Sequence, residues 1–393
     1  MRLVFDGTRF TVEVPDRSEF LDALRGAAAD WPFAVIAARG EPVASVRAVD
    51  DQYEVRADDN ELIETSAVGA ACSVIVDVVK GYVEENPSRL CLHCGSVAFA
   101  GRLVIFPSEY RAGKSTLVAR LAAGGHQVFG DDVLPLSDDD ACGLALGLAP
   151  RLRLPLPDEA ATAFQQFVAK HAGPGDGYYQ YLDLPEGRLA RRGATLPLGA
   201  VILLDRQADG AACLGRASRS ATLQALITRN FARTAPAGDL LDRLHRVMDR
   251  LPLFALRYSD LEDAAALLER TFAQWPPRAG EIAFDARRAS GEAMVVAGDL
   301  ADKIAGLRLR QNPAIKLHAV DGELFLADAE GLAIHHLNVM GAGLWNLLAE
   351  PVTEAEAAEV LCGAFPDADP AAIARDVRAL FAVLFAGQFV LPA

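Results

Sequence analysis

The sequence predicts an α/β core with a P-loop, preceded by a small α+β module and followed by a C-terminal domain of three strands and three helices. Three observations support this fold class. A buried strand, a Gly-Lys-Ser loop and a helix follow one another in residues 103–123. Short strands and one long helix precede them, and from residue 305 strand patterns give way to helix patterns. A chain of 393 residues is long enough for two or three such domains.

Composition and charge exclude several classes of function. The formal net charge of −15 disfavours binding to the phosphate backbone of nucleic acids. Apolar runs fall short of the ~18 uncharged residues of a membrane span, and the amino terminus lacks a signal-peptide pattern. Six cysteines in a chain of this length do not form a disulfide framework. We therefore expect a cytoplasmic protein without nucleic-acid or membrane partners, and the oligomeric state stays open.

Residues 1–86 are expected to form the α+β module. Two strands alternate around Asp6-Gly7, a pair that supplies the positive φ of a hairpin turn. Residues 67–84 have the apolar spacing of an amphipathic helix. The expected strands are Leu3–Phe5, Phe10–Val14, Phe33–Ile36, Val43–Val46 and Tyr53–Val55. No residue of this module carries a recognisable chemistry, so its role stays open.

Residues 87–276 are expected to form the α/β core. Leu90–Ala100 and Leu103–Phe106 are predicted strands, and the second leads into the P-loop. Later core elements are predicted at 115–123, 127–129, 200–204, 218–233, 238–250 and 264–275, with a loop-rich stretch between 132 and 200. Pro276-Pro277 marks a boundary, and residues 277–304 are a predicted linker.

Residues 305–393 are expected to form the C-terminal domain. Its second helix begins with Thr353 as N-cap and Glu356 three residues later, which is a capping box. The predicted strands are Ile315–Val320, Glu323–Ala327 and Leu332–Leu337, and the predicted helices are Ala342–Leu348, Thr353–Ala364 and Pro370–Phe385.

The segment 108–116, Ser-Glu-Tyr-Arg-Ala-Gly-Lys-Ser-Thr, matches a P-loop at every position but the first, where Ser108 replaces glycine. Backbone N–H groups and the start of the following helix would then face the phosphates of ATP. Lys114 would bridge the terminal phosphates, and Ser115 would ligate Mg²⁺. The expected ATP-binding residues are Arg111, Ala112, Gly113, Lys114, Ser115 and Thr116.

Two other interpretations of this segment stay open. The Gly-Lys-Ser-Thr string also fits an ordinary strand-to-helix turn. Tyr110 and Arg111 are bulky for a loop that wraps phosphate, so the loop could be degenerate, with weak or absent binding. Alternatively, Arg111 adds a cation to the phosphate cradle.

Asp131 and Asp132 end the strand that follows the P-loop helix. Adjacent strand residues point to opposite sides, so one carboxylate can approach a metal while the other orients and deprotonates an acceptor hydroxyl. The alternative is a solvated acidic turn. His93 lies on the strand before the P-loop strand, and by itself a strand histidine is usually structural. Cys91 and Cys94 flank it, but no second cysteine pair completes a zinc site.

These residues resemble the catalytic core of the HPr kinase/phosphorylase family and its smaller relatives in peptide biosynthesis clusters, over residues 88–270. The family pattern is a strand histidine, a P-loop ending Gly-Lys-Ser, a Gly-His pair and a strand ending Asp-Asp. This chain has His93, Gly113-Lys114-Ser115, Gly125-His126 and Asp131-Asp132, with 21 residues from His93 to Lys114 and 18 from Lys114 to Asp132.

The resemblance implies a kinase whose general base is Asp132, acting on a serine hydroxyl. It also implies that Lys114 and His93 stabilise the transferred phosphoryl group and that Ser115 helps to hold Mg²⁺.

This chain departs from the family in three loop residues and lacks its downstream Glu-Ile-Arg-Gly segment, which supplies a metal-binding glutamate. Asp131 is expected to take that role, and Arg229 is a candidate for the later arginine. The reverse reaction, phosphorolysis of phosphoserine, is correspondingly less expected.

Residues 308–393 resemble the PqqD-like peptide-recognition family, winged-helix-type domains that bind the leader peptides of ribosomally made, modified peptides. Such a domain can accept an extended peptide as an added strand on its third strand, with the last helix as the other wall of the groove. The candidate groove residues are Ile334, His336, Arg375 and Leu380, although apolar positions here also fit a core.

Together the two resemblances predict an ATP- and Mg²⁺-dependent kinase that phosphorylates a hydroxyl, with serine expected, on a ribosomally synthesised precursor peptide. Capture of the peptide would raise the effective concentration of the acceptor. Two alternatives stay open: a kinase that acts on a small molecule or folded protein, and a non-catalytic peptide-binding scaffold with a degenerate P-loop. The identity of the peptide and of its acceptor residue is not predicted.

Overall fold

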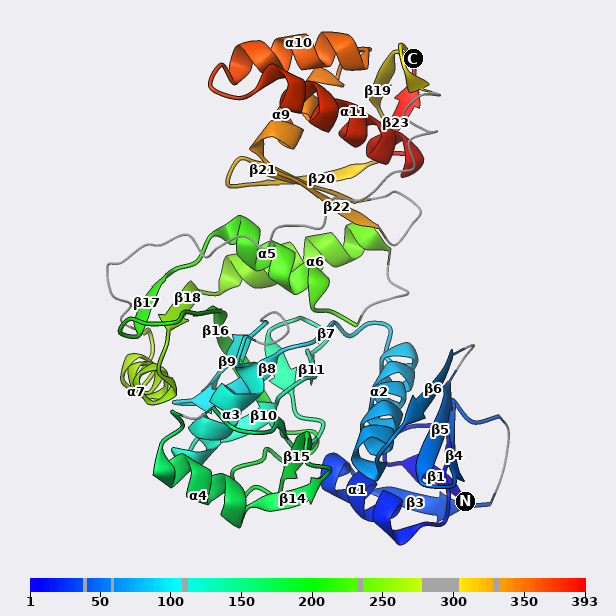
Figure 1. The fold of residues 1–393 in the computed structure, drawn as a ribbon, viewed down its shortest axis with the longest axis vertical. Helices are drawn as coiled ribbons and strands as arrows, with labels where there is room; N and C mark the ends of the chain where they lie inside the picture. Colours follow the sequence, from blue (N-terminus) through cyan, green and yellow to red (C-terminus); the bar gives the residue numbers. More distant parts are fainter. Residues whose placement is uncertain are drawn as a thin grey trace. The chain divides into compact units, whose positions relative to one another are not determined.

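The computed structural model describes residues 1–37, 41–57, 60–107, 112–157, 159–231, 236–277, 304–327 and 333–393 (Figure 1). The chain packs into two compact units. The first comprises Met1–Ala217, Thr228–Ala232 and Val247–Ala286, and the second comprises Ser218–Ile227, Arg233–Arg246 and Arg287–Ala393. The predicted domain limits at 86, 276 and 304 stay predictions, and nearly all of the predicted linker lies outside the described residues. No described helix has both the length and the apolar character needed to cross a bilayer.

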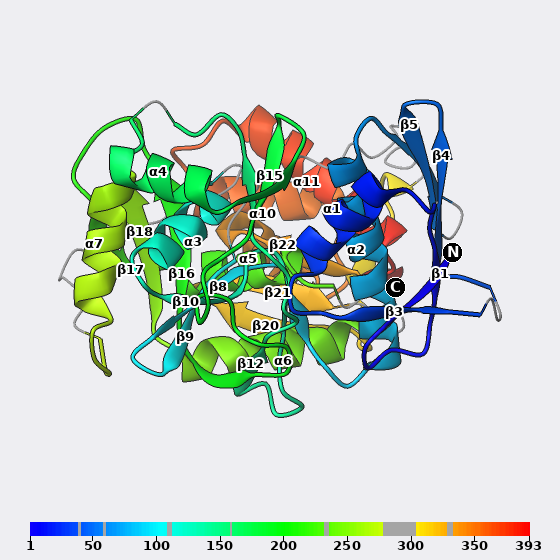
Figure 2. The ribbon, with the colours of Figure 1, turned by 90° about the horizontal axis from the view of Figure 1, so that it is seen from below.

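The N-terminal part of the first unit is a six-stranded sheet with two helices packed side by side against it (Figures 1 and 2). The strand order is β3-β1-β2-β4-β5-β6. The elements are β1 (Arg2–Phe5), β2 (Val12–Glu13), α1 (Ser18–Ala28), β3 (Phe33–Ile36), β4 (Ala44–Val49), β5 (Gln52–Ala57), β6 (Asn60–Glu64) and α2 (Ala67–Glu85). The five predicted strands and the long helix are present, whereas α1 and β6 were not predicted.

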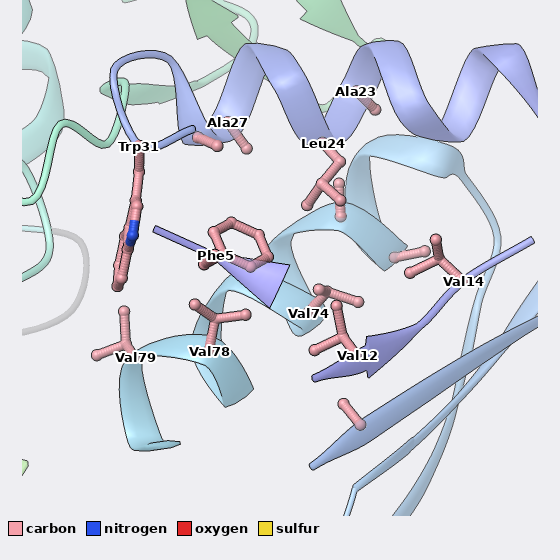
Figure 3. Close-up of a cluster of buried hydrophobic side chains, with 14 of the residues drawn as sticks. Phe5, Val12, Val14, Ala23, Leu24, Ala27, Trp31, Val74, Val78 and Val79 are labelled. Carbon is pink, nitrogen blue, oxygen red and sulfur yellow. The ribbon is translucent and has the colours of Figure 1, made fainter. Parts of the chain in front are cut away.

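A continuous apolar core joins this sheet to α1 and α2. Figure 3 shows the ring of Phe5 between side chains of the two helices, with Trp31 beside it. The Phe5 and Trp31 rings are 5.6 Å apart in an edge-to-face arrangement, which is favourable beyond the area that it buries. The same core includes Leu146 and Tyr181 from beyond residue 86, so the N-terminal sheet packs as part of the first unit.

The strand before the P-loop segment, β9, belongs to a seven-stranded sheet with the order β10-β8-β9-β16-β18-β17, on which β12 also pairs with β16. The strands β9, β16 and β18 are parallel to one another, and β8 runs antiparallel to β9 and β10. The strands are β8 (Gly95–Phe99), β9 (Arg102–Phe106), β10 (Gln127–Gly130), β12 (Cys142–Leu144), β16 (Thr195–Arg206), β17 (Cys213–Arg216) and β18 (Leu253–Tyr258). Helices α3 (Lys114–Ala123) and α7 (Leu261–Thr271) pack with this sheet.

The predicted strand Leu90–Ala100 is interrupted. It divides into β7 (Cys91–Leu92) and β8, with His93 and Cys94 between them. β7 leaves the main sheet to pair with β11 (Leu134–Pro135). Because the break falls at His93, this histidine lies where the chain passes from one sheet to the other.

The stretch predicted as loop-rich contains regular structure. A three-stranded sheet has the order β13-β15-β14, and the apolar face of α4 packs with part of α3. The elements are β13 (Arg151–Arg153), α4 (Thr162–Lys170), β14 (Ala172–Gly175) and β15 (Tyr179–Leu182). The prediction was wrong here because the strands are short and α4 buries only Phe164 and Val168 fully.

The second unit contains a three-stranded sheet, β20-β21-β22, followed by three helices. Its elements are β19 (Leu309–Gln311), β20 (Lys316–Val320), β21 (Glu323–Ala327), β22 (Ile334–Leu337), α9 (Val339–Leu347), α10 (Glu354–Ala364), α11 (Pro370–Ala386) and β23 (Val390–Pro392). The predicted order of strands and helices is present, and the capping box at Thr353 is formed. β19 and β23 form an additional pair that was not predicted.

Helices α5 (Arg219–Thr228) and most of α6 (Ala237–Arg250) pack in this second unit. The Asp321 carboxylate, in the β20–β21 turn, accepts hydrogen bonds from the backbone N–H groups of Arg219 and Ser220. The Lys316 ammonium contacts Asp239 at 3.0 Å and Asp242 at 3.2 Å. α5 is shorter than the predicted helix 218–233, because the residues after Thr228 pair with β7 instead.

Candidate active site

The P-loop lies between the end of β9 and the start of α3. Gly113 is the N-cap of α3 and has φ +85°, a region that L side chains rarely adopt. A Cβ at this position would lie 2.6 Å from the Tyr258 hydroxyl oxygen, which itself donates a 3.0 Å hydrogen bond to the carbonyl of Ala112. Glycine is therefore required both by the backbone and by the close approach of Tyr258.

Residues 108–111 of the P-loop lie outside the described residues. The predicted nucleotide contact of Arg111 and the alternative of a degenerate loop thus both stay predictions. Ala112 to Thr116 are described and form the last two loop residues and the first three residues of α3.

Lys114 and His93 both contact Asp132, which lies two residues beyond the end of β10, so Asp131 and Asp132 follow this strand rather than end it as predicted. The Lys114 Nζ atom lies 2.7 Å from the Asp132 Oδ1 atom, and the His93 Nε2 atom lies 3.2 Å from the same oxygen. The Lys114 side chain is 11% exposed, whereas that of Asp132 is 48% exposed. Two side chains from separate parts of the chain thus meet at one carboxylate that solvent can reach.

The pKa of Asp132 lies below its ordinary value. Burial of its surroundings raises the pKa, but the hydrogen bond from His93 and the positive charge of Lys114 lower it by more. Asp132 is therefore ionised at neutral pH, as required of a group that orients or deprotonates a hydroxyl.

Asp131 has the opposite environment, because its side chain points into the protein and is only 4% exposed. Its Oδ2 atom accepts a 3.3 Å hydrogen bond from the backbone N–H of Arg151, while its Oδ1 atom has no partner in the described parts of the chain. Burial, and then the adjacent charge of Asp132, raise the pKa of Asp131 to about 7. A buried carboxylate oxygen without a partner is costly unless a cation reaches it.

The donor set fits one Mg²⁺ ion that arrives with a nucleotide. Ser115, in the first turn of α3, faces the Asp131 carboxylate. The described residues contain no group of three or more His, Cys, Asp or Glu side chains that could hold a metal. Mg²⁺ in kinase sites is held by one or two protein ligands together with substrate phosphates and water. Ser115 and Asp131 match that requirement.

The backbone around His93 is held by a segment that follows α5. The His93 N–H donates a 2.7 Å hydrogen bond to the Arg229 carbonyl, and the Phe231 N–H donates to the Cys91 carbonyl. The Phe231 ring lies 5.7 Å from the His93 ring. The Nε atom of Arg229 is buried and has no hydrogen-bond partner among the described residues. Arg229 thus lies beside His93, whereas Phe231 was missed because no motif marks it.

The cysteines beside His93 are structural. Cys91 and Cys94 are buried, and burial raises the pKa of both thiols, that of Cys94 to about 12. His126, of the Gly-His pair, packs its ring 4.3 Å from that of Phe99 and lies 3.3 Å from the Ala98 carbonyl.

The candidate groove residues fall on two elements of the second unit. Ile334 and His336 lie on β22, and Arg375 and Leu380 lie on α11. His336 contacts the buried Glu323 carboxylate at 2.7 Å and stacks on Phe325. β22 pairs with β21 on one side, and its other edge carries no strand in the described residues. Binding of a peptide by these four residues stays a prediction.

Comparison with known proteins supports the C-terminal resemblance. The family model described as Coenzyme PQQ synthesis protein D (PqqD) matches residues 323–390, from β21 to the start of β23. No curated protein matches the chain.

Among solved structures, the chain is similar to the Hpr(Ser) kinase/phosphatase from Coxiella burnetii, with 18% identity and a TM-score of 0.19. The match covers 29% of this chain and 58% of that structure, which is less than two thirds of its length. Both resemblances predicted from the sequence are thus found again in these comparisons.

Proposed function

We propose that this chain is an ATP- and Mg²⁺-dependent kinase that phosphorylates a hydroxyl, with serine as the expected acceptor, on a ribosomally synthesised precursor peptide. The observation that carries the proposal is the convergence of Lys114 and His93 on Asp132, directly beside the P-loop helix. An ion pair that only stabilised the fold would not explain why the neighbouring Asp131 is buried. One oxygen of its carboxylate has no hydrogen-bond partner among the described residues.

The residues would act in an order that their contacts suggest. An incoming phosphate competes with Asp132 for the Lys114 ammonium, which frees the Asp132 carboxylate to accept the proton of the acceptor hydroxyl. The hydroxyl oxygen bonds to the γ-phosphorus as the bond to the leaving oxygen of ADP breaks. His93 and Lys114 would stabilise the charge on the transferred group. Bound Mg²⁺, held by Ser115 and Asp131, would neutralise charge on the phosphates.

The peptide would be captured by the C-terminal domain. The match of residues 323–390 to PqqD supports this part of the proposal, and so does the position of β22 as an edge strand of its sheet in the described residues. An extended peptide can add to such an edge through backbone hydrogen bonds, while side chains alternate into the adjoining surface. Tethering by the leader would make phosphorylation of the acceptor effectively intramolecular.

Transfer of label from [γ-³²P]ATP to precursor peptides encoded beside this chain tests the proposal. We expect wild-type protein to label a peptide that binds the C-terminal domain, and Asp132→Asn to reduce the rate by about 100-fold or more. Asp138→Asn is the matched control, because the Asp138 side chain is 73% exposed and, among the described residues, contacts Arg89 at 3.7 Å and Ser88.

Each other outcome has a defined meaning. Binding of the peptide without transfer of phosphate would support the alternative of a non-catalytic peptide-binding scaffold. Transfer to a small molecule or a folded protein, but to no peptide, would support the second alternative. Undiminished phosphate transfer by Asp132→Asn would show that Asp132 does not act as the general base.

A further inference from the structure

A cavity of about 540 Å³ lies in the first unit at the opposite end of the core sheet from the P-loop. Its lining includes Arg102, the first residue of β9, together with Gly199 near the start of β16 and Pro252 directly before β18. These three strands are parallel, so the cavity lies at their N-terminal ends. The P-loop follows the C-terminal end of β9, where ligands of α/β sheets usually bind. The cavity is therefore separate from the proposed nucleotide site.

Two arginines, Arg102 and Arg250, line this cavity, and the nearby Asp139 carboxylate attracts Arg250 electrostatically. Arg102 donates a 3.4 Å hydrogen bond to the Leu198 carbonyl, and Arg250 donates a 3.1 Å bond to the Asp139 carbonyl. The Arg102 guanidinium forms no ion pair with a carboxylate of the described residues. One acidic residue, Asp140, also lines the cavity, so the lining is positive by one charge in a chain whose net charge is −15.

The indole of Trp275 supplies a flat wall whose position is fixed. Its Nε1 atom donates a 2.9 Å hydrogen bond to the Phe99 carbonyl. A Cβ at Gly199 would lie 2.5 Å from the indole, so only glycine allows this approach. The Arg102 guanidinium lies 5.9 Å from the centre of the ring. A cation and an aromatic face thus adjoin in a preformed cavity.

We propose that this cavity binds a small organic anion that carries a planar ring. The anionic group would lie between Arg102 and Arg250, whose guanidinium forks match carboxylate and phosphate oxygens. The ring would pack against Trp275. The volume is within the ~300–1,000 Å³ range of small-molecule pockets.

Calorimetric titration of phenyl phosphate into the full chain tests the proposal. We expect one site per chain, and a Kd that rises about tenfold or more in Arg250→Gln, because each charged hydrogen bond contributes about 1.5–3 kcal/mol. Arg25→Gln is the control, since Arg25 is 62% exposed and pairs with Asp22. Cyclohexyl phosphate should bind more weakly than phenyl phosphate, because it cannot stack on an indole.

The variants separate this site from the nucleotide site. Lys114→Ala should keep full affinity for phenyl phosphate, and loss of binding there would instead assign the probe to the P-loop and overturn the proposal. Equal affinity of wild type and Arg250→Gln, or no binding by wild type at millimolar phenyl phosphate, would also overturn it. Arg250 is exposed on the last turn of α6, so this variant is expected to fold, and its melting temperature checks that it does.

Discussion

Asp131 and Asp132 are neighbours in sequence, but their surroundings give them different properties. Asp132 contacts Lys114 and His93 and stays ionised, whereas Asp131 is buried and its pKa is raised. Alternation along a strand predicts that the two carboxylates face different partners. The sequence cannot predict which of them is buried, because that depends on Arg151, a residue that only tertiary folding brings to Asp131.

Replacement of Asp131 by asparagine should stabilise the protein in a pH-dependent way. The pKa of Asp131 in the folded state, about 7, lies above its ordinary value. At pH values between the ordinary pKa and the folded-state pKa of Asp131, the folded protein binds more protons than the unfolded chain. The free energy of unfolding therefore falls as pH rises through this window. Asp131→Asn removes this loss of stability, because the asparagine side chain does not ionise. We expect a melting temperature raised by about 2–4 °C or more at pH 8, and little change at pH 5.

Differential scanning fluorimetry without nucleotide or Mg²⁺ measures this effect, with Asp138→Asn as a control that should change neither temperature. Equal gains at both pH values would contradict the assigned environment of Asp131, and so would a loss of stability at pH 8.

The resemblance to the HPr kinase family groups His93, Lys114 and Asp132 in one site. The structure places the Lys114 Nζ atom 2.7 Å and the His93 Nε2 atom 3.2 Å from the Asp132 Oδ1 atom. Their catalytic roles stay predictions. Phe231 and the Arg229 carbonyl, which hold His93, could not be predicted, since β7 pairs with a segment more than a hundred residues away along the chain.

Helix α5 depends on a residue from another element for its N-terminal hydrogen bonds. The Asp321 carboxylate accepts from the N–H groups of Arg219 and Ser220 at 2.9 and 3.2 Å, although it lies about a hundred residues further along the chain. Asp321 also has φ +52° in the β20–β21 turn, a conformation that Asp and Asn tolerate better than most residues.

Two substitutions at Asp321 should therefore differ. Asp321→Ala loses both the helix cap and the turn preference, and we expect it to lower the free energy of unfolding of the second unit by about 1–2 kcal/mol. Asp321→Asn keeps a side-chain acceptor and the turn preference, so its loss should be clearly smaller. Chemical denaturation followed by circular dichroism measures both. Equal losses in the two variants would contradict this expectation, because the neutral acceptor and the turn preference of asparagine would then contribute nothing.

Elements with a strong local pattern were predicted, and elements without one were not. The N-cap and apolar spacing of α10 are local, and that helix is found close to its predicted limits. β18 was missed because only Leu251-Pro252 separates it from α6, so no clear turn signal divides the two elements. The short strands β13 to β15 lack apolar alternation, and only their pairing with one another defines them.

At the scale of the whole molecule, the grouping of α5 and α6 was the least predictable feature. Both helices precede the predicted linker in sequence, yet α5 up to Ile227 and α6 up to Arg246 pack in the unit that holds the C-terminal sheet. The ion pairs of Lys316 and the hydrogen bond from the buried Ser220 hydroxyl to Glu323 hold them there. These are tertiary contacts between residues far apart in sequence, so no local pattern signals them.

Hydrogen exchange should report this grouping. In increasing denaturant, the amides of α5 should lose protection together with those of β20–β22, because they belong to one packed unit. The amides of β9, β16 and β18 should lose protection at different denaturant concentrations from those of α5. Mass spectrometry of peptic fragments measures both sets, and protection of α5 that follows β16 instead would contradict the grouping.

The proposed function requires that the P-loop and Asp132 form a site that binds the phosphates of a nucleotide. Calorimetric titration of Mg²⁺-ATP into the full chain tests it most directly, with Lys114→Ala as the test variant and Lys170→Ala, an exposed lysine of α4, as the control. We expect one site per chain in wild type and Lys170→Ala, and an affinity weakened by about 10- to 100-fold in Lys114→Ala. Absence of binding in the wild type, or equal affinity in all three proteins, would contradict it.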